Sequence, residues 1–163
     1  MNTPLANQAA TVLPGSISFV TVTDDDDDSS NLFTLGTGIA YRIIENLYGG
    51  LNIGYGRESG DDFSSTIYLV GPQVRYYVPI GKTSAFLGAN AAFGKQKFDA
   101  DGLFDSESDL RSFGGVLGLA YPLGSKVDIE GQITYDTATA TDEDDDDSDV
   151  TLFGFRIGFA IRL

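Results

Sequence analysis

The sequence predicts an all-β fold in which eight antiparallel strands run up and down and close into a barrel. Apolar residues recur at every second position along most of the chain, which is the period of a β-strand, and helical spacing is hard to find. The connections alternate between short turns and longer polar loops, as in an antiparallel meander. Eight such strands can close into a barrel, because closure removes the two exposed edges.

Eight segments are predicted to be strands, at residues 16–23, 32–43, 48–58, 63–78, 84–98, 110–121, 126–140 and 150–163. Short turns (IENL, PIGKT and PLGS) follow the second, fourth and sixth segments. Acidic stretches such as DDDDDSSN and TDEDDDDSD follow the first, third, fifth and seventh. We therefore expect a flexible N-terminal segment at residues 1–15 and one barrel domain at residues 16–163.

Most segments carry large apolar residues on one face and small or charged residues on the other, although the phase of the first segment is ambiguous. The apolar faces are Phe33, Leu35, Ile39, Tyr41 and Ile43; Tyr68, Val70, Val74, Tyr76 and Val78; Leu87, Ala89, Ala91 and Phe93; Phe113, Leu117, Leu119 and Tyr121; Val127, Ile129, Ile133 and Tyr135; and Phe153, Phe155, Ile157, Phe159, Ile161 and Leu163. Which of the two faces points inward depends on whether the barrel lies in water or in a membrane.

The charged face favours the membrane orientation. An eight-stranded barrel has an interior just wide enough to be filled by side chains. In a soluble barrel the large apolar face would fill that interior, whereas a membrane barrel turns it outward. The arginines and carboxylates of the other face can pair in a narrow lumen, where the small residues leave room for them. The alternatives are a soluble barrel that binds an apolar ligand and, beyond it, a sandwich or a designed chain.

Aromatic residues on the apolar face also indicate a membrane. They recur eight positions apart in three pairs, Phe33 and Tyr41, Tyr68 and Tyr76, and Phe113 and Tyr121. Eight residues of a tilted strand span roughly 20 Å. This is close to the apolar band of about 25 Å between the aromatic girdles of a membrane barrel. The chain is therefore predicted to cross a membrane through its strands.

The composition excludes several classes of function. The 163 residues include no cysteine and no histidine, which removes disulfides, thiolate metal sites and Ser-His-Asp or Cys-His catalysis. The net charge of −14 disfavours nucleic acid, which needs clustered lysine and arginine. No apolar run is long enough for a transmembrane helix, and no signal peptide is visible after Met1. We expect that the protein is not an enzyme.

Together these features resemble the small outer-membrane β-barrels of the OmpA and OmpX type. The resemblance covers residues 16–163 and includes the alternating apolar residues of the C-terminal VTLFGFRIGFAIRL. The sequence departs from the family pattern at Leu163, where the family usually has an aromatic residue. The resemblance implies a monomer in the bacterial outer membrane, in contact with lipid and lipopolysaccharide. It also implies periplasmic termini and turns, with the acidic loops outside the cell. Barrel enzymes with a similar scaffold rely on histidine, which this chain lacks.

The long loops hold most of the 24 carboxylates. Oxygen clusters suit Ca²⁺ or Mg²⁺, so weak divalent-cation binding is a hypothesis for Asp24, Asp26, Asp28, Asp144 and Asp146. Loosely bound Ca²⁺ or Mg²⁺ would be the only cofactor. The alternative is a solvated set of mutually repelling loops. The same loops are candidates for docking a protein partner in the membrane or outside the cell.

A second set of charged residues is cationic and lies just beyond the apolar band, at Arg57, Lys95, Lys97 and Arg111. At headgroup level these side chains suit the phosphates of lipopolysaccharide. The alternative interpretation is snorkelling, or pairing with nearby loop carboxylates.

The third set is the charge network predicted for the lumen, which comprises Arg42, Arg75, Asp128, Glu130, Asp136, Arg156 and Arg162. It is interpreted as a salt-bridge plug, and a gate or selectivity filter is the alternative. The sequence therefore predicts a small closed outer-membrane barrel with a structural or surface-interaction role, in membrane integrity, adhesion or partner docking. A narrow channel for ions or small solutes is the alternative function, followed by the soluble barrel.

Overall fold

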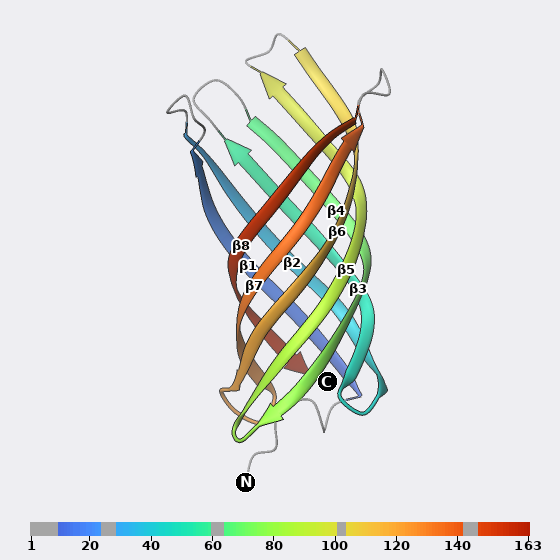
Figure 1. Ribbon diagram of the computed structural model, residues 1–163, viewed down its shortest axis with the longest axis vertical. Coiled ribbons are helices and arrows are strands. Elements are labelled where there is room, and N and C mark those ends of the chain that lie inside the picture. The colour runs from blue at the N-terminus through green and yellow to red at the C-terminus, as the bar shows by residue number, and fades with distance from the viewer. Residues whose placement is uncertain (1–9, 24–28, 60–63, 101–103, 142–146) are drawn as a thin grey trace.

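The computed structural model describes residues 10–23, 29–59, 64–100, 104–141 and 147–163, and it confirms the predicted all-β barrel (Figure 1). Each strand pairs with the next one along the chain, and β8 returns to β1, so the sheet closes. The strands are β1 Thr11–Thr23, β2 Ser29–Ile44, β3 Leu47–Ser59, β4 Ser64–Ile80, β5 Thr83–Ala100, β6 Phe104–Pro122, β7 Val127–Thr141 and β8 Asp147–Arg162.

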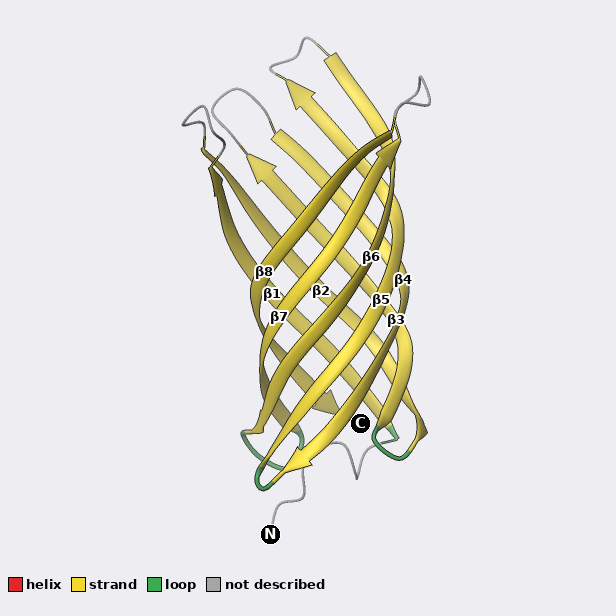
Figure 2. Cartoon of the chain, in the orientation of Figure 1, coloured by secondary structure: helices red, strands yellow, loops and turns green. Residues whose placement is uncertain are grey.

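Short connections gather at one end of the barrel, which we call the turn end, and the opposite end is the loop end (Figure 2). Two of the turns consist of two residues each, Glu45–Asn46 and Gly81–Lys82. Asn46 (φ 65°) and Gly81 (φ 63°) adopt the left-handed conformation that such tight turns require and that Asn and Gly tolerate best.

Several strands are longer than the apolar pattern predicts. β1 begins at Thr11 where the sequence predicted residue 16, and β8 begins at Asp147 where it predicted residue 150. The extension of β8 is the polar segment Asp147–Asp149, where side-chain alternation does not mark a strand. The extension of β1 contains Val12, Leu13 and Pro14, and there apolar residues occupy both faces. In the part of the chain that the structure describes, no helix is both long and apolar enough to cross a bilayer.

The arrangement of side chains identifies the inner face. Glu130 (0% exposed), Asp128 and Gln132 point into the barrel and are almost fully buried. Large apolar residues occupy the alternate positions and are exposed, with Phe153 reaching 73%. In water this arrangement would expose the apolar surface and bury the charges, both of which are unfavourable. The apolar exterior predicted for a membrane barrel is therefore confirmed.

Gly94 lies on the inner face of β5 where β5 approaches β4 closely. A Cβ atom at this position would overlap the carbonyl oxygen of Tyr68, so the two strands would have to separate. We expect Gly94→Val to lower the free energy of unfolding by about 1–3 kcal/mol, as measured by urea unfolding in detergent micelles. Gly124→Val is the control, because a Cβ at Gly124 has no atom within 4 Å. Equal losses in the two variants would contradict this close approach.

Candidate functional site

Strand β7 presents a row of polar side chains to the lumen. The row runs from the turn end toward the loop end and consists of Asp128, Glu130, Gln132, Thr134 and Asp136, all of them buried. These residues alternate with exposed apolar ones, so the period of the strand alone places them on one face. Three carboxylates in a water-poor interior need cationic partners. Those partners are arginines from β4 and β8.

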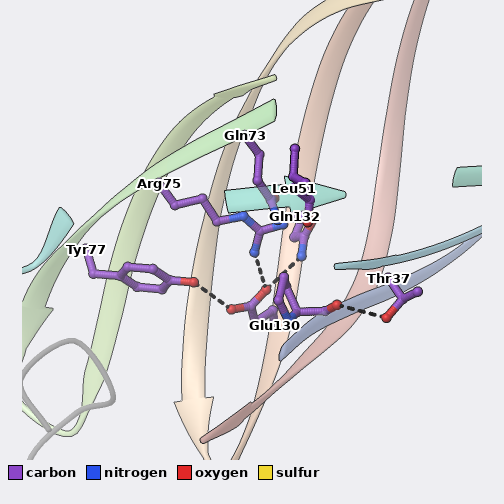
Figure 3. Close-up of polar contacts among 8 residues, drawn as sticks. Thr37, Leu51, Gln73, Arg75, Tyr77, Glu130 and Gln132 are labelled. Carbon is purple, nitrogen blue, oxygen red and sulfur yellow. Dashed lines mark hydrogen bonds and ion pairs between the residues drawn. The ribbon is translucent and has the colours of Figure 1, made fainter. Parts of the chain in front are cut away.

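The central pair crosses the lumen from β4 to β7 (Figure 3). Arg75 donates from Nη1 to Oε2 of Glu130 at 2.9 Å. Glu130 also accepts a hydrogen bond from the Tyr77 hydroxyl at 3.1 Å and one from Nε2 of Gln132 at 2.8 Å. Three donors therefore satisfy one fully buried carboxylate, which is the condition under which a buried charge is tolerated.

Aromatic side chains pack around the central pair. The Arg75 guanidinium lies 5.3 Å from the centre of the Phe86 ring, a distance at which cations interact with the ring face. The Phe86 ring in turn lies 5.2 Å from that of Tyr77, and Tyr48 meets Tyr77 edge-on at 5.7 Å. These rings belong to a buried apolar cluster that also includes Val12 and Ala160. The turn-end half of the lumen is consequently filled with side chains.

Two further ion pairs link β7 to its neighbour β8. Arg162 donates to Asp128 at 3.1 Å near the turn end, and both side chains are buried. Arg156 donates to Asp136 at 3.2 Å farther toward the loop end, where a third of the arginine side chain is exposed. Asn90 adds a longer hydrogen bond to Asp136, at 3.4 Å. The three pairs together leave the described lumen close to electrically neutral.

The structure brings together six of the seven residues predicted for the lumenal network, as the pairs Arg75–Glu130, Arg156–Asp136 and Arg162–Asp128. Arg42 is the exception. It is exposed near the end of β2, beside a shift of register, and within the described residues it forms no ion pair. Alternation predicted its face correctly, but a residue so close to the turn end has left the enclosed part of the barrel.

Sequence reasoning missed Tyr77, Gln132 and Asn90 as members of the network. Tyr77 could have been found, because it alternates with the lipid-facing Tyr76 and Val78. The donors to Glu130 come from β4 and from β7 itself, and only the curvature of the closed sheet brings β4 across the lumen to β7.

The loop-end half of the lumen holds a cavity of about 510 Å³, which we call the loop-end cavity. Its floor is polar and includes Gln73, Arg75, Gln132 and Arg156. Much of its wall is apolar, with inward side chains from β4, β6 and β8, namely Ile67, Leu69, Leu110, Val116 and Leu152. The sequence predicted a small and polar inner face throughout, so this apolar wall is a correction. Four of these residues have an apolar neighbour on the outer face, so alternation alone could not assign them. Leu110 differs, because it stands between the exposed Asp109 and Arg111.

The four cations predicted at headgroup level lie exposed on the outside of β3, β5 and β6. Arg57, Lys97 and Glu107 fall in one row of the sheet, with Thr66 of β4 between the two cations. Lys95 forms an ion pair with Glu107, and Lys97 lies 3.6 Å from the same carboxylate. Arg111 pairs in register with Phe93. We call Arg57, Lys95, Lys97 and Arg111 the basic patch.

Glu107 influences the charge of the patch. Its hydrogen bond with Lys95 raises the pKa of that amine, and the same bond holds the pKa of the Glu107 carboxyl below its usual value. Both groups are therefore charged at neutral pH.

The carboxylates proposed for divalent cations, Asp24, Asp26, Asp28, Asp144 and Asp146, lie outside the described residues. Among the residues that are described, no three acidic side chains come together as a metal site.

An apolar exterior around a lumen of paired charges defines a small transmembrane β-barrel. The chain belongs to the outer membrane protein beta-barrel domain family, whose model matches residues 4–160. It is accordingly a protein of the bacterial outer membrane. No curated protein sequence matches it.

Three solved structures of low sequence identity have a similar fold. Neisserial surface protein A is 17% identical with a TM-score of 0.73, over 95% of this chain and 98% of that one. The N-terminal β-barrel domain of Pseudomonas aeruginosa OprF is 10% identical with a TM-score of 0.60, over 95% and 98%. A major outer membrane protein from Thermus thermophilus is 13% identical with a TM-score of 0.51, over 96% and 100%. These similarities support the fold alone.

Proposed function

We propose that the protein is a closed, non-enzymatic barrel whose lumen is plugged in its turn-end half and whose role is at the cell surface. The observation that carries the plug is the Arg75–Glu130 pair, which crosses the lumen at 2.9 Å and is surrounded by Tyr48, Tyr77 and Phe86. Glu130 has three hydrogen-bond donors in this network, although Nε of Arg75 has no partner among the described residues. The rings packed around the pair fill the space beside it, so we infer that no continuous water path crosses this level of the lumen. The current through a reconstituted barrel tests the plug. The alternative function, a narrow channel, requires this network to open.

The loop end is proposed to face outside the cell, where the basic patch contacts phosphates of lipopolysaccharide. The patch lies just beyond the belt formed by the aromatic pairs Tyr55–Tyr68 and Phe93–Phe113, and such belts mark the headgroup level. Arginine and lysine bind phosphate through charge-assisted hydrogen bonds. Glu107 competes for Lys95 and Lys97, so the two arginines are expected to contribute most.

Binding of fluorescent lipopolysaccharide to the detergent-solubilised barrel tests this contact. Replacing Arg57 or Arg111 by Gln should each weaken binding by about fivefold, which corresponds to about 1 kcal/mol for an exposed charge contact. Glu107→Gln should strengthen binding, because it releases two lysines. Lys126→Gln, an exposed cation at the turn end, is the matched control. If all four variants bind like the wild type, the patch is not a phosphate site.

The acidic loops are proposed to dock a partner at the surface or to bind Ca²⁺ or Mg²⁺ weakly. The support is their concentration of carboxylates, which Asp24–Asp28 and Asp144–Asp147 illustrate. Calorimetric titration of the barrel with CaCl₂ tests the cation; heat that persists after Asp144 and Asp146 are changed to Asn would assign it to other residues.

A further inference from the structure

The seam between β1 and β8 is closed over only part of its length. Residues Val12–Ile17 of β1 pair with Ile157–Arg162 of β8. At the turn end, the backbone N–H of Leu163 also donates a hydrogen bond to the carbonyl oxygen of Thr11. β1 continues to pair with β2 as far as Thr23, and β8 pairs with β7 from Asp147. In the described parts of β1 beyond Ile17 and of β8 before Ile157, each strand is therefore paired on one side only. Figure 1 shows the two strands leaning apart toward the loop end.

This gap begins near the middle of the apolar band. Phe153 lies opposite Tyr135 of β7 at the level of the loop-end aromatic belt, and Ile161 lies eight residues farther along, near the turn end. Of the β8 residues that pair with β1, Ile157 is the one nearest the loop end, and it lies halfway between Phe153 and Ile161. The gap therefore spans the half of the membrane that lies toward the loop end, and we call it the β1–β8 gap.

Cavities reach the gap from both sides of the barrel wall. The loop-end cavity is lined by Ser16 of β1 and by Leu152 and Arg156 of β8. A groove on the outer surface is lined by apolar residues of β1, β7 and β8, among them Ile17 and Phe155. The same groove also reaches Ser18, whose side chain is buried at 7% exposure. The lumen and the lipid-facing surface thus approach each other where the pairing stops.

The lining determines what this opening accepts. An unpaired strand edge at membrane depth is tolerated only where it is buried in protein or lines a water-filled cavity, and here the edge borders the loop-end cavity and its polar side chains. The wall carries the apolar Leu69, Leu110 and Val116 beside polar residues such as Asn90, Gln96 and Ser112. Along the apolar side chains a polar solute would lose its hydration without gaining hydrogen bonds. The polar floor at Arg75 and Gln132 limits how deep an apolar group can go. The ligand that fits an apolar wall reached sideways from the membrane is a hydrocarbon chain.

We propose that the β1–β8 gap is a lateral portal through which one acyl chain of a lipid in the loop-end leaflet enters the loop-end cavity. The chain contacts Leu69, Leu110 and Val116, and its headgroup stays at the bilayer surface. This function is separate from the plug and from the basic patch, since it depends on neither a current nor phosphate binding.

Quenching of a tryptophan by brominated acyl chains tests the portal, because the chain contains no tryptophan of its own. Leu110→Trp places the reporter on the cavity wall, and Leu69→Trp is a second reporter on another strand. Each variant is reconstituted into phosphatidylcholine vesicles with brominated or ordinary acyl chains. We expect both reporters to be quenched in brominated vesicles about as strongly as the lipid-facing Leu117→Trp. A reporter that is quenched by aqueous acrylamide but not by brominated lipid overturns the proposal.

A disulfide that closes the gap supplies the decisive comparison. The chain contains no cysteine of its own, so an introduced pair can react only with each other or with another copy of the chain. Val20→Cys and Gly154→Cys would lie opposite each other if the register of β1 and β8 continued, and a Cβ at Gly154 meets only an ordinary contact at 3.5 Å. Oxidation of this pair should abolish the quenching of Leu110→Trp, and reduction should restore it. The matched pair Ile17→Cys and Ile157→Cys closes a position that is already paired, so quenching should persist there.

Three results would contradict the portal. Quenching that survives the Val20–Gly154 disulfide would mean that acyl chains reach the cavity by another route. If brominated lipid quenches neither Leu110→Trp nor Leu69→Trp, the proposal is wrong even where the disulfide does not form. If the variant that combines Val20→Cys with Leu110→Trp forms a disulfide-linked dimer and its tryptophan is not quenched, the gap is assigned to a second copy of the chain.

Discussion

Arg75→Met is expected to lower the free energy of unfolding of the barrel by about 3–5 kcal/mol, because it leaves a buried carboxylate without its cation. Glu130 has no exposed surface, and Tyr77 and Gln132 alone would remain to stabilise its charge. Replacing both members of the pair, as Arg75→Met with Glu130→Leu, should recover much of the loss, since no unpaired charge then remains. Urea unfolding in detergent micelles measures these two variants and the single variant Glu130→Leu, which completes the double-mutant cycle.

Arg156→Met is the matched control for this cycle. Its side chain is one-third exposed, and its partner Asp136 keeps a hydrogen bond from Asn90. A smaller loss than that of Arg75→Met is expected. The prediction is contradicted if the losses of unfolding free energy in Arg75→Met and Glu130→Leu are simply additive in the double variant, and Arg156→Met loses as much as Arg75→Met. The lumen-crossing pair would then have no special role in stability.

Leu117→Arg is expected to lower the free energy of unfolding of the barrel in lipid vesicles by about 2–4 kcal/mol, the cost of an arginine on the lipid face at the midplane. Leu117 is 59% exposed, lies four residues from both Phe113 and Tyr121, and is flanked in register by Leu87 and Ile133. Its surroundings are therefore hydrocarbon on the outside and apolar neighbours on both sides. Reversible urea unfolding from phosphatidylcholine vesicles gives the value.

Thr137→Arg is the control at a different depth. Thr137 also faces outward, but it pairs with Phe113 at the aromatic belt, where an arginine costs about 0–1 kcal/mol. A difference between the two substitutions therefore reports depth in the bilayer and not the charge itself. Equal costs would mean that the exposed apolar face does not contact the hydrocarbon core.

Alternation along the strands was sufficient to predict the barrel and the inner face of most strands, but it did not predict the apolar wall of the loop-end cavity. The run from Phe153 to Leu163 illustrates the correct assignment. Its large apolar residues are exposed, except for the half-buried Ile161, and its two arginines, Arg156 and Arg162, form ion pairs with β7. The carboxylate partners on β7 were predicted for the same reason: an inward row of acids and an inward row of arginines in a narrow lumen must neutralise each other.

Depth and register could not be predicted in this way, because a period of two assigns a face and says nothing of height along the barrel. Arg42 has inward parity and nonetheless ends near the turn end, exposed. Tyr77 and Arg75 reach Glu130 only because curvature brings β4 across from β7. The pairing of β1 with β8 stops at Ile17 and Ile157. Where it stops depends on the stagger of the strands in the closed sheet, and the residue types at these two positions do not indicate it.

The current across a planar lipid bilayer that contains the reconstituted wild-type barrel tests the central claim, that the lumen is closed at Arg75 and Glu130. We expect no steady current above that of a protein-free bilayer at either polarity, because the β1–β8 gap opens only into the loop-end cavity, on the far side of the plug from the turn end. A stable unitary current from the wild-type barrel would contradict a closed lumen and would favour the narrow channel.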